Sequence, residues 1–329
     1  MAKRRFLKHL DSRHALVIAL PIIFLLFIPV LSGWSTYIMH LVISCLMYGT
    51  LASAFDLSLG YLGILNFGFA GFFGAGAYAA GLASTKLGLS PWVSWLLGGA
   101  FSCLLGLVTG LLALRFKSKL VFAMFTWFFG LTIQQICYVW IDLTGGMRGL
   151  LTPPLPSVKL PFFEINFADR AIRTPYYYTM LMIAISTLVL LYMIVKSRIG
   201  ITFKAIRDDE IAAEMLGIDT YRAKVLNFTI SCFVAGIIGG FYCFYIGVLS
   251  PDTVLSTDLT VQILTMSYIG GRGTLWGPLL GSFIVILLLE AFRPLIIYRL
   301  IFYGCLLILT MIFFPKGISG IKKYIWKSQ

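Results

Sequence analysis

Charged residues are scarce in this sequence, and their scarcity excludes an ordinary soluble domain. Only 12% of the 329 residues are Asp, Glu, Lys or Arg, about half of the usual share, whereas 59% are hydrophobic. A soluble chain of this length could not bury so much apolar surface in one core. A bilayer accepts it, because about 20 apolar residues in a helix span the hydrocarbon layer. The composition therefore predicts an all-α fold, a polytopic transmembrane bundle of about eight to ten spans.

The sequence also lacks the residue groupings of an enzyme or a metal protein. Its three histidines pair with no nearby Glu or Cys in a metal-binding pattern, and its six cysteines lie in apolar stretches without a CxxC pair. No HExxH, GxSxG or GxxxxGK[ST] motif is present. We therefore predict no catalytic residue, no metal and no cofactor on this chain. If ATP drives it, the ATP and its Mg²⁺ must bind another subunit.

The placement of basic residues predicts the topology. Lys and Arg cluster between long apolar runs, which is the pattern of cytoplasmic loops and of attraction to anionic lipid, so the net charge of +13 does not indicate a nucleic acid partner. We expect both termini, including a tail over 1–14, to be cytoplasmic. We place the membrane segments at about 15–33, 36–56, 67–84, 91–114, 120–141, 175–195, 225–247, 257–270, 277–292 and 296–314.

Three of these ten segments are short or rich in glycine, and two glycine-rich stretches stand in different halves of the chain. The first stretch covers 60–78 and the second covers 268–283, including Gly270 and Gly271. Paired glycine-broken segments often flank a transport pathway. The glycines also allow close helix packing, and both interpretations can hold together. If the short segments are half-helices, eight or nine full spans remain.

Polar side chains within the predicted spans are few, and they mark candidate pathway positions. Gln134 and Gln135 lie near the middle of segment 120–141, where an interhelical hydrogen bond is the competing interpretation. Asp56 stands at the inner end of its segment, where we expect water to reach it. Carboxylates are nearly absent from mid-membrane positions. This counts against an ion-coupled secondary transporter, and the missing polar clusters count against a membrane enzyme or scaffold.

Two loops are long enough to contact other proteins. The loop over 142–174 is expected outside the cell membrane; its prolines exclude a regular helix, and it either touches an extracytoplasmic partner or lies on the bilayer as a connector. The loop over 196–224 is expected in the cytoplasm.

The cytoplasmic loop carries the signals of one short helix from about 209 to 216. Asp208 or Asp209 can cap its N-terminus, and Glu210 adds negative charge to the first turn. Gly217 is placed to end the helix in the left-handed conformation, with Ile218 packing back. So short a helix is not stable alone, and we expect a partner protein to support it.

Three stretches resemble the permease subunits of branched-chain amino acid importers of the ATP-binding-cassette (ABC) class, the LivM type. They are GYLGILNFGFAGFFGAGAY at 60–78, KSRIGITFKAIRDDEIAAEMLGIDTYRAKVLNF at 196–228 and SPDTVLSTDLTVQILTMSYIGGRGTLWGPLLG at 250–281. A closing FFPKGISG follows at 313–320. The order and spacing match over most of the chain, so residues 1–329 resemble one permease domain with the ABC importer permease fold.

The resemblance implies an assembly in a bacterial or archaeal cytoplasmic membrane. Such permeases pair with a second permease, sit on two cytoplasmic ATP-binding subunits, and receive leucine, isoleucine or valine from a periplasmic or lipid-anchored binding protein. The cytoplasmic loop then corresponds to the segment that couples the permease to the ATPases. Its candidate coupling residues are Lys204, Arg207, Asp208, Asp209, Glu210, Ala212, Ala213, Glu214 and Gly217.

The sequence departs from the family at two places. The family pattern Glu-Ala-Ala followed by Gly becomes Ile211, Ala212, Ala213 and Gly217, which leaves the register of the coupling helix open. Asn66 and Phe69 stand where family members often carry Ser and His. If these positions line the pathway, the substrate differs; urea, a short-chain amide or another amino acid is the alternative to branched-chain amino acids.

Overall fold

The structure is a computed structural model that describes most of the chain between residues 25 and 317. The described residues are 25–29, 33, 35–116, 118–159, 164–167, 169, 173–291, 301, 304–306, 308, 309, 312 and 317. The predicted tail at 1–14 and most of the predicted segments 15–33 and 296–314 lie outside these residues.

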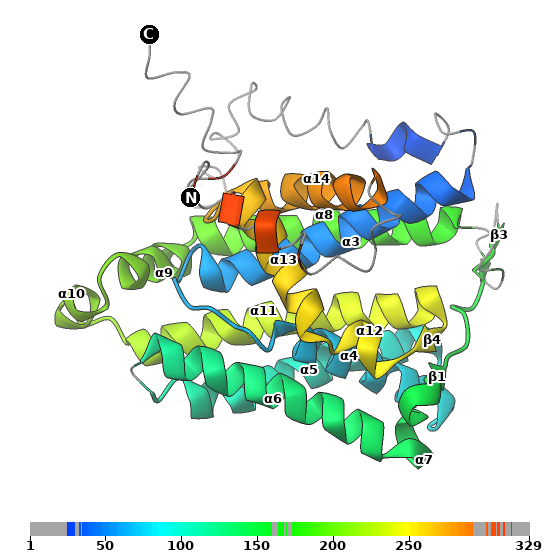
Figure 1. The fold of residues 1–329 in the computed structure, drawn as a ribbon, viewed down its shortest axis with the longest axis horizontal. Helices are drawn as coiled ribbons and strands as arrows, with labels where there is room; N and C mark the ends of the chain where they lie inside the picture. The colour runs from blue at the N-terminus through cyan, green and yellow to red at the C-terminus, as the bar shows by residue number, and fades with distance from the viewer. Residues whose placement is uncertain are drawn as a thin grey trace, which may run out of the picture.

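Long helices form the body of the described part. Five of them are long and apolar enough to cross a bilayer: α3 (Thr36–Leu59), α5 (Pro91–Ala113), α6 (Lys119–Val139), α8 (Thr174–Lys196) and α11 (Thr220–Ile246). Three helices predicted to be short are short: α4 (Phe69–Thr85), α13 (Thr257–Gly270) and α14 (Gly277–Ala291) have 17, 14 and 15 residues. The prediction of a helical, multi-pass bundle is confirmed (Figure 1).

Glycines bring α4, α5 and α11 into close contact at the centre of the bundle. A Cβ added to Gly76 of α4 would lie 2.5 Å from the Cα of Gly236 on α11. A Cβ on Gly98 of α5 would lie 2.4 Å from the carbonyl oxygen of Gly76. The Ser102 hydroxyl of α5 donates to the carbonyls of Phe72 and Cys232, at 2.9 and 2.8 Å. Close backbone packing therefore accounts for Gly76 in the first glycine-rich stretch.

The connection between α3 and α4 is an irregular segment over 60–68. It leaves the bundle near helix α9 (Arg198–Asp208) and returns toward the middle, where α4 begins (Figure 1). A Cβ on Gly68 would lie 1.9 Å from the carbonyl oxygen of Thr126 in α6, so the segment packs tightly against that helix. The second interruption is the turn over 271–276 between α13 and α14, where Gly271 and Gly273 have positive φ angles.

Short elements gather at the end of the bundle away from α9, which we call the strand end (Figure 1). They are α7 (Ile141–Thr144), the 3₁₀ turn Gly146–Arg148, β1 (Leu150–Leu151), β2 (Val158–Lys159), β3 (Glu164–Ile165), β4 (Val248–Leu249) and α12 (Pro251–Val254). Strands β1 and β4 pair antiparallel, as do β2 and β3. In its described residues, the loop over 142–174 contains single helical turns and strands β1, β2 and β3 between α6 and α8.

Candidate functional site

Two helices, α9 (Arg198–Asp208) and α10 (Glu210–Met215), project from the end of the bundle opposite the strands, called here the α9 end (Figure 1). The sequence predicted one helix in this segment, so α9 corrects that prediction. The Ser197 hydroxyl caps α9 by accepting from the backbone N–H of Ile199, at 3.2 Å. Phe203 and Ile206, three residues apart, bury one face of the helix. The same spacing is visible in the sequence, where Phe203 and Ile206 alternate with the basic residues Lys204 and Arg207.

The predicted termini of α10 are confirmed. Asp209, rather than Asp208, caps the helix by accepting from the backbone N–H groups of Ile211 and Ala212, at 2.9 and 3.1 Å. Gly217 has a φ angle of +81°, and its N–H donates to the Glu214 carbonyl at 2.9 Å. The next N–H, of Ile218, donates to the Ala213 carbonyl at 3.1 Å, which completes a Schellman motif. The two caps set the bounds of the helix at Glu210 and Met215.

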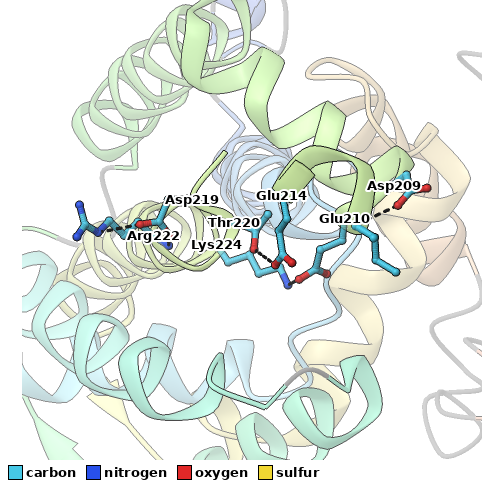
Figure 2. Close-up of polar contacts among 8 residues, drawn as sticks. Asp209, Glu210, Glu214, Asp219, Thr220, Arg222 and Lys224 are labelled. Carbon is cyan, nitrogen blue, oxygen red and sulfur yellow. Dashed lines mark hydrogen bonds and ion pairs between the residues drawn. The ribbon is translucent and has the colours of Figure 1, made fainter. Parts of the chain in front are cut away.

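The chain itself holds α10 in place. The carboxylate of Glu210 pairs with the Lys224 ammonium group on α11, and the Thr220 hydroxyl donates to Glu214 at 2.8 Å (Figure 2). Ala213 is buried against the bundle. We expected a partner protein to support this helix. The chain itself supplies part of that support, because both glutamates of α10 bond to α11.

An apolar surface remains exposed on and beside α10. Ile211, Met215 and Leu216 are 68%, 84% and 81% exposed, and we call these three residues the α10 face. Large apolar side chains that cluster on an exposed surface mark a contact site for another protein or for a membrane. Sequence reasoning missed this surface because it followed the charges. The signal was available, since positions i and i+4 share one face of a helix.

Two of the three basic residues of α9, Lys204 and Arg207, contact the membrane bundle. Arg207 donates from Nη1 to the carbonyl of Gly60, at 2.8 Å, and from Nε and Nη2 to the carboxylate of Asp208. The Lys204 ammonium lies 5.7 Å from the ring centre of Tyr61, a cation–π distance. Lys204 and Arg207, two of the predicted coupling residues, therefore contact the segment that joins α3 to α4.

The predicted pathway residues fall in three places. Asn66 and Phe69 lie at the start of α4, both buried. The Asn66 side-chain oxygen accepts from the Gly68 N–H at 3.0 Å, whereas its Nδ2 is buried without a hydrogen-bond partner in the described part of the chain. Gln134 and Gln135 lie on α6, half-buried and exposed respectively.

The other two predicted pathway residues, Gly270 and Gly271, form the end of α13 and its turn. A Cβ on Gly270 would lie 1.9 Å from the carbonyl oxygen of Gly277, and Gly271 has a φ angle of +112°. The contact at Gly270 leaves no room for a side chain, so this glycine allows α13 and α14 to approach closely. The positive φ angle of Gly271 is one that residues with a side chain rarely adopt.

Asp56 is buried, which corrects the expectation that water reaches it. Its side chain is 1% exposed. One carboxylate oxygen accepts from the Ser267 hydroxyl at 2.9 Å, and the other accepts from the Gly273 N–H at 2.8 Å. Both partners are more than 200 residues away in the sequence, so no local pattern could have predicted this site. Among the described residues, no three His, Cys, Asp or Glu side chains gather to hold a metal ion.

Comparisons with known proteins agree with this architecture. The chain is 26% identical to the high-affinity branched-chain amino acid transport system permease protein LivM of Salmonella typhimurium, over 83% of this chain and 68% of that protein. It is 26% identical to the corresponding permease protein LivH of Escherichia coli, over 55% of this chain and 59% of LivH. The BraD permease protein of Pseudomonas aeruginosa is 23% identical, over 83% of this chain and 91% of BraD. No solved structure matches the chain.

The family comparison covers most of the described helices. The family described as "Branched-chain amino acid transport system / permease component" matches residues 37–312, from the start of α3 to beyond α14. Because the match spans well over half of the sequence, the chain belongs to the family of branched-chain amino acid transport system permease components.

Proposed function

We propose that this chain is the membrane-spanning permease subunit of an ABC importer and that it translocates leucine, isoleucine and valine. The observation that carries the proposal is α10, a helix capped at both ends and fixed to the bundle by Glu210 and Lys224, with an exposed apolar face. Such a helix can transmit force as a rigid piece. The family, and the substrates named for its relatives, support the choice of solute.

The proposed assembly has four kinds of partner. A second permease pairs with this chain, consistent with similarity to relatives named both LivM and LivH. Two cytoplasmic ATP-binding subunits bind and hydrolyse Mg·ATP, and an extracytoplasmic binding protein delivers the solute. The host membrane is a bacterial or archaeal cytoplasmic membrane. Both termini and the α9 end face the cytoplasm, and the strand end, with the loop over 142–174, faces the binding protein.

In this assembly, the α10 face docks in a groove of one ATP-binding subunit. Burying Ile211, Met215 and Leu216 would remove apolar side chains from water, the main favourable contribution in most protein associations. The charged residues beside them, Asp208 and Asp209, remain exposed at the rim. The glutamates contribute indirectly, because their bonds to α11 keep the helix in one orientation.

Asn66 and Phe69 are our proposed residues of the translocation pathway. A buried amide nitrogen without a partner is costly, and functional sites are one place where such atoms occur. The Asn66 Nδ2 group can donate to the carboxylate of a passing amino acid. It can equally donate to the carbonyl of urea or of a short-chain amide, which makes an amide importer the second candidate function.

The test is solute uptake in proteoliposomes that contain this chain, its partner permease, the ATP-binding subunits and the binding protein. We expect uptake of radiolabelled leucine that requires both ATP and the binding protein. ATP-driven uptake of urea without leucine uptake would keep the architecture and replace the substrate. Uptake by this chain alone, driven by an ion gradient, would overturn the proposal in favour of a secondary transporter.

A further inference from the structure

Three segments of the chain meet around the carboxyl group of Asp56 at the α9 end of the bundle. Asp56 belongs to the last turns of α3, and its two oxygens accept from Ser267 on α13 and from Gly273 in the turn over 271–276. Its main-chain carbonyl accepts from the N–H of Gly60, at 2.7 Å. Burying a carboxyl group costs free energy unless it is hydrogen-bonded, so these bonds hold the segments in one arrangement.

Glycines make this meeting point too tight for independent movement. A Cβ on Gly60 would lie 2.3 Å from the backbone nitrogen of Gly273 and 2.4 Å from the nearer oxygen of Asp56. Gly273 has a φ angle of +73°, and a Cβ there would lie 3.3 Å from both the Arg207 Nη1 atom and the Gly60 carbonyl oxygen. Closely packed backbones transmit displacement because they have no free volume to absorb it.

Arg207 connects this point to the helices outside the bundle. Its Nη1 atom donates to the Gly60 carbonyl at 2.8 Å, while Nε and Nη2 hold Asp208 at 3.2 and 3.1 Å. Arg207 lies in the last turn of α9, and Asp209, two residues later, caps α10. Because only Asp208 separates Arg207 from the cap of α10, a displacement of α10 also moves Arg207.

We propose that Asp56, Gly60, Arg207, Ser267 and Gly273, which we call the Asp56 junction, transmit movement of α9 and α10 to both interrupted membrane segments. One branch runs from Arg207 to the segment over 60–68 and so to α4. The other runs through Asp56 to the turn over 271–276 and so to α14. Arg207 and Asp56 are positioning residues in this scheme. The inference rests on the proposed function, since it assigns the route by which the ATP-binding subunits act on the pathway.

The experiment measures solute transported per ATP hydrolysed by the complete complex in proteoliposomes. The variants are Arg207→Ala, Ser267→Ala and the double variant, and Arg198→Ala is the matched control. Arg198 is an exposed arginine on the same helix as Arg207. Its replacement by alanine removes the same positive charge without touching the Asp56 contacts. Ser267→Ala removes one hydrogen bond to Asp56 while keeping the buried carboxyl group, so it is the gentler variant if Arg207→Ala fails to accumulate.

We expect each single variant to lower transport per ATP by at least about fivefold, the lower end of typical coupling effects. The loss of transport per ATP in the double variant should be no greater than the larger of the two single losses, because the effects of residues in one network are not additive. Arg207→Lys should recover part of the loss, since an ammonium group can still donate to Gly60. Arg198→Ala should match the wild type.

Two results would overturn the Asp56 junction as a relay. One is a double variant whose loss is the product of the single losses, which means that the residues act separately. The other is a normal ratio of transport to ATP hydrolysis together with reduced thermal stability, which means that the contacts only hold the fold. A wild-type complex that transports no solute with ATP is a different outcome, because it overturns the proposed function itself.

Discussion

Lys224 and Glu210, fourteen residues apart in the sequence, form an ion pair that joins α10 to α11. The two side chains are 11% and 27% exposed, so the pair is largely shielded from water. An α10 of six residues could not persist alone, because helix nucleation is costly. The ion pair attaches it to a helix of 27 residues that packs through the bundle. The orientation of the α10 face therefore depends on this ion pair and on the Thr220–Glu214 hydrogen bond more than on helix propensity.

We predict that Glu210→Gln destabilises the protein, because it leaves the Lys224 ammonium group shielded and without its countercharge. The free energy of unfolding should fall by about 1–3 kcal/mol, measured by thermal unfolding of the purified protein in detergent. Adding Lys224→Met to this variant should restore part of the loss, since an apolar pair can replace a buried ion pair.

The matched control for this prediction is Arg222→Gln. Its ion pair with Asp219 is 87% and 51% exposed at the two side chains, so its loss should change stability by no more than about 0.5 kcal/mol. Equal effects of Glu210→Gln and Arg222→Gln would show that the Glu210 pair does not hold α10.

Substitutions at Gly217 test the C-terminal cap of α10 and leave side-chain packing unchanged. Its φ angle is +81°, and a Cβ there would meet no atom within 4 Å. Gly217→Ala should therefore cost only the left-handed backbone strain, about 1–2 kcal/mol. Gly217→Pro should abolish ATP-driven transport while the protein still reaches the membrane, because proline cannot adopt this φ angle or donate to Glu214.

Gly88 is the control for that pair of variants. It also has a positive φ angle, +64°, with no atom within 4 Å of an added Cβ, but it lies in the connection between α4 and α5. Gly88→Pro should leave transport close to the wild-type rate. Transport that survives Gly217→Pro at a normal rate would show that α10 does not couple ATP hydrolysis to movement.

We predict that substitutions on the α10 face weaken assembly with the ATP-binding subunits and leave the folding stability of the permease nearly unchanged. Replacing Ile211, Met215 and Leu216 by serine should weaken co-purification of the ATP-binding subunits at least about tenfold, which corresponds to about 1.4 kcal/mol of binding free energy. Thermal stability of the permease should change by less than about 0.5 kcal/mol per residue, since the three side chains are exposed. Leu87→Ser, at a position 71% exposed between α4 and α5, should leave co-purification intact. Undiminished binding by the triple variant would place the ATPase contact elsewhere.

Features set by neighbouring residues could be predicted from the sequence. Asp208 or Asp209 was predicted as the N-cap and Gly217 as the helix end, because capping depends on side chains and φ angles within a few positions. The same physics extends α11 beyond the predicted membrane segment at 225–247. The helix begins at Thr220, because Asp219 caps it by accepting from the Arg222 N–H.

Features set by distant residues could not be predicted. Asp56 and Gly273 are 217 residues apart, and Arg207 and Gly60 are 147 residues apart. Hydropathy placed Asp56 at the end of a span, and its burial comes from segments distant in the sequence, α13 and the turn over 271–276. Likewise, nothing local to Glu210 indicates whether it faces a partner or Lys224.

Gly236 allows a test of the close packing between α5 and α11. A Cβ on Gly236 would lie 2.3 Å from the Cβ of Ser102, so Gly236→Ala must push α11 away from α5 and stretch the Ser102 bond to Cys232. We expect a loss of about 1–3 kcal/mol in the free energy of unfolding, as is typical of an overpacked core, measured by thermal unfolding in detergent. Gly304→Ala is the matched control, because an added Cβ there meets no atom of the described residues within 4 Å. If the two variants melt at the same temperature, α5 and α11 can separate without cost, and the close contact at Gly236 is not what holds the bundle together.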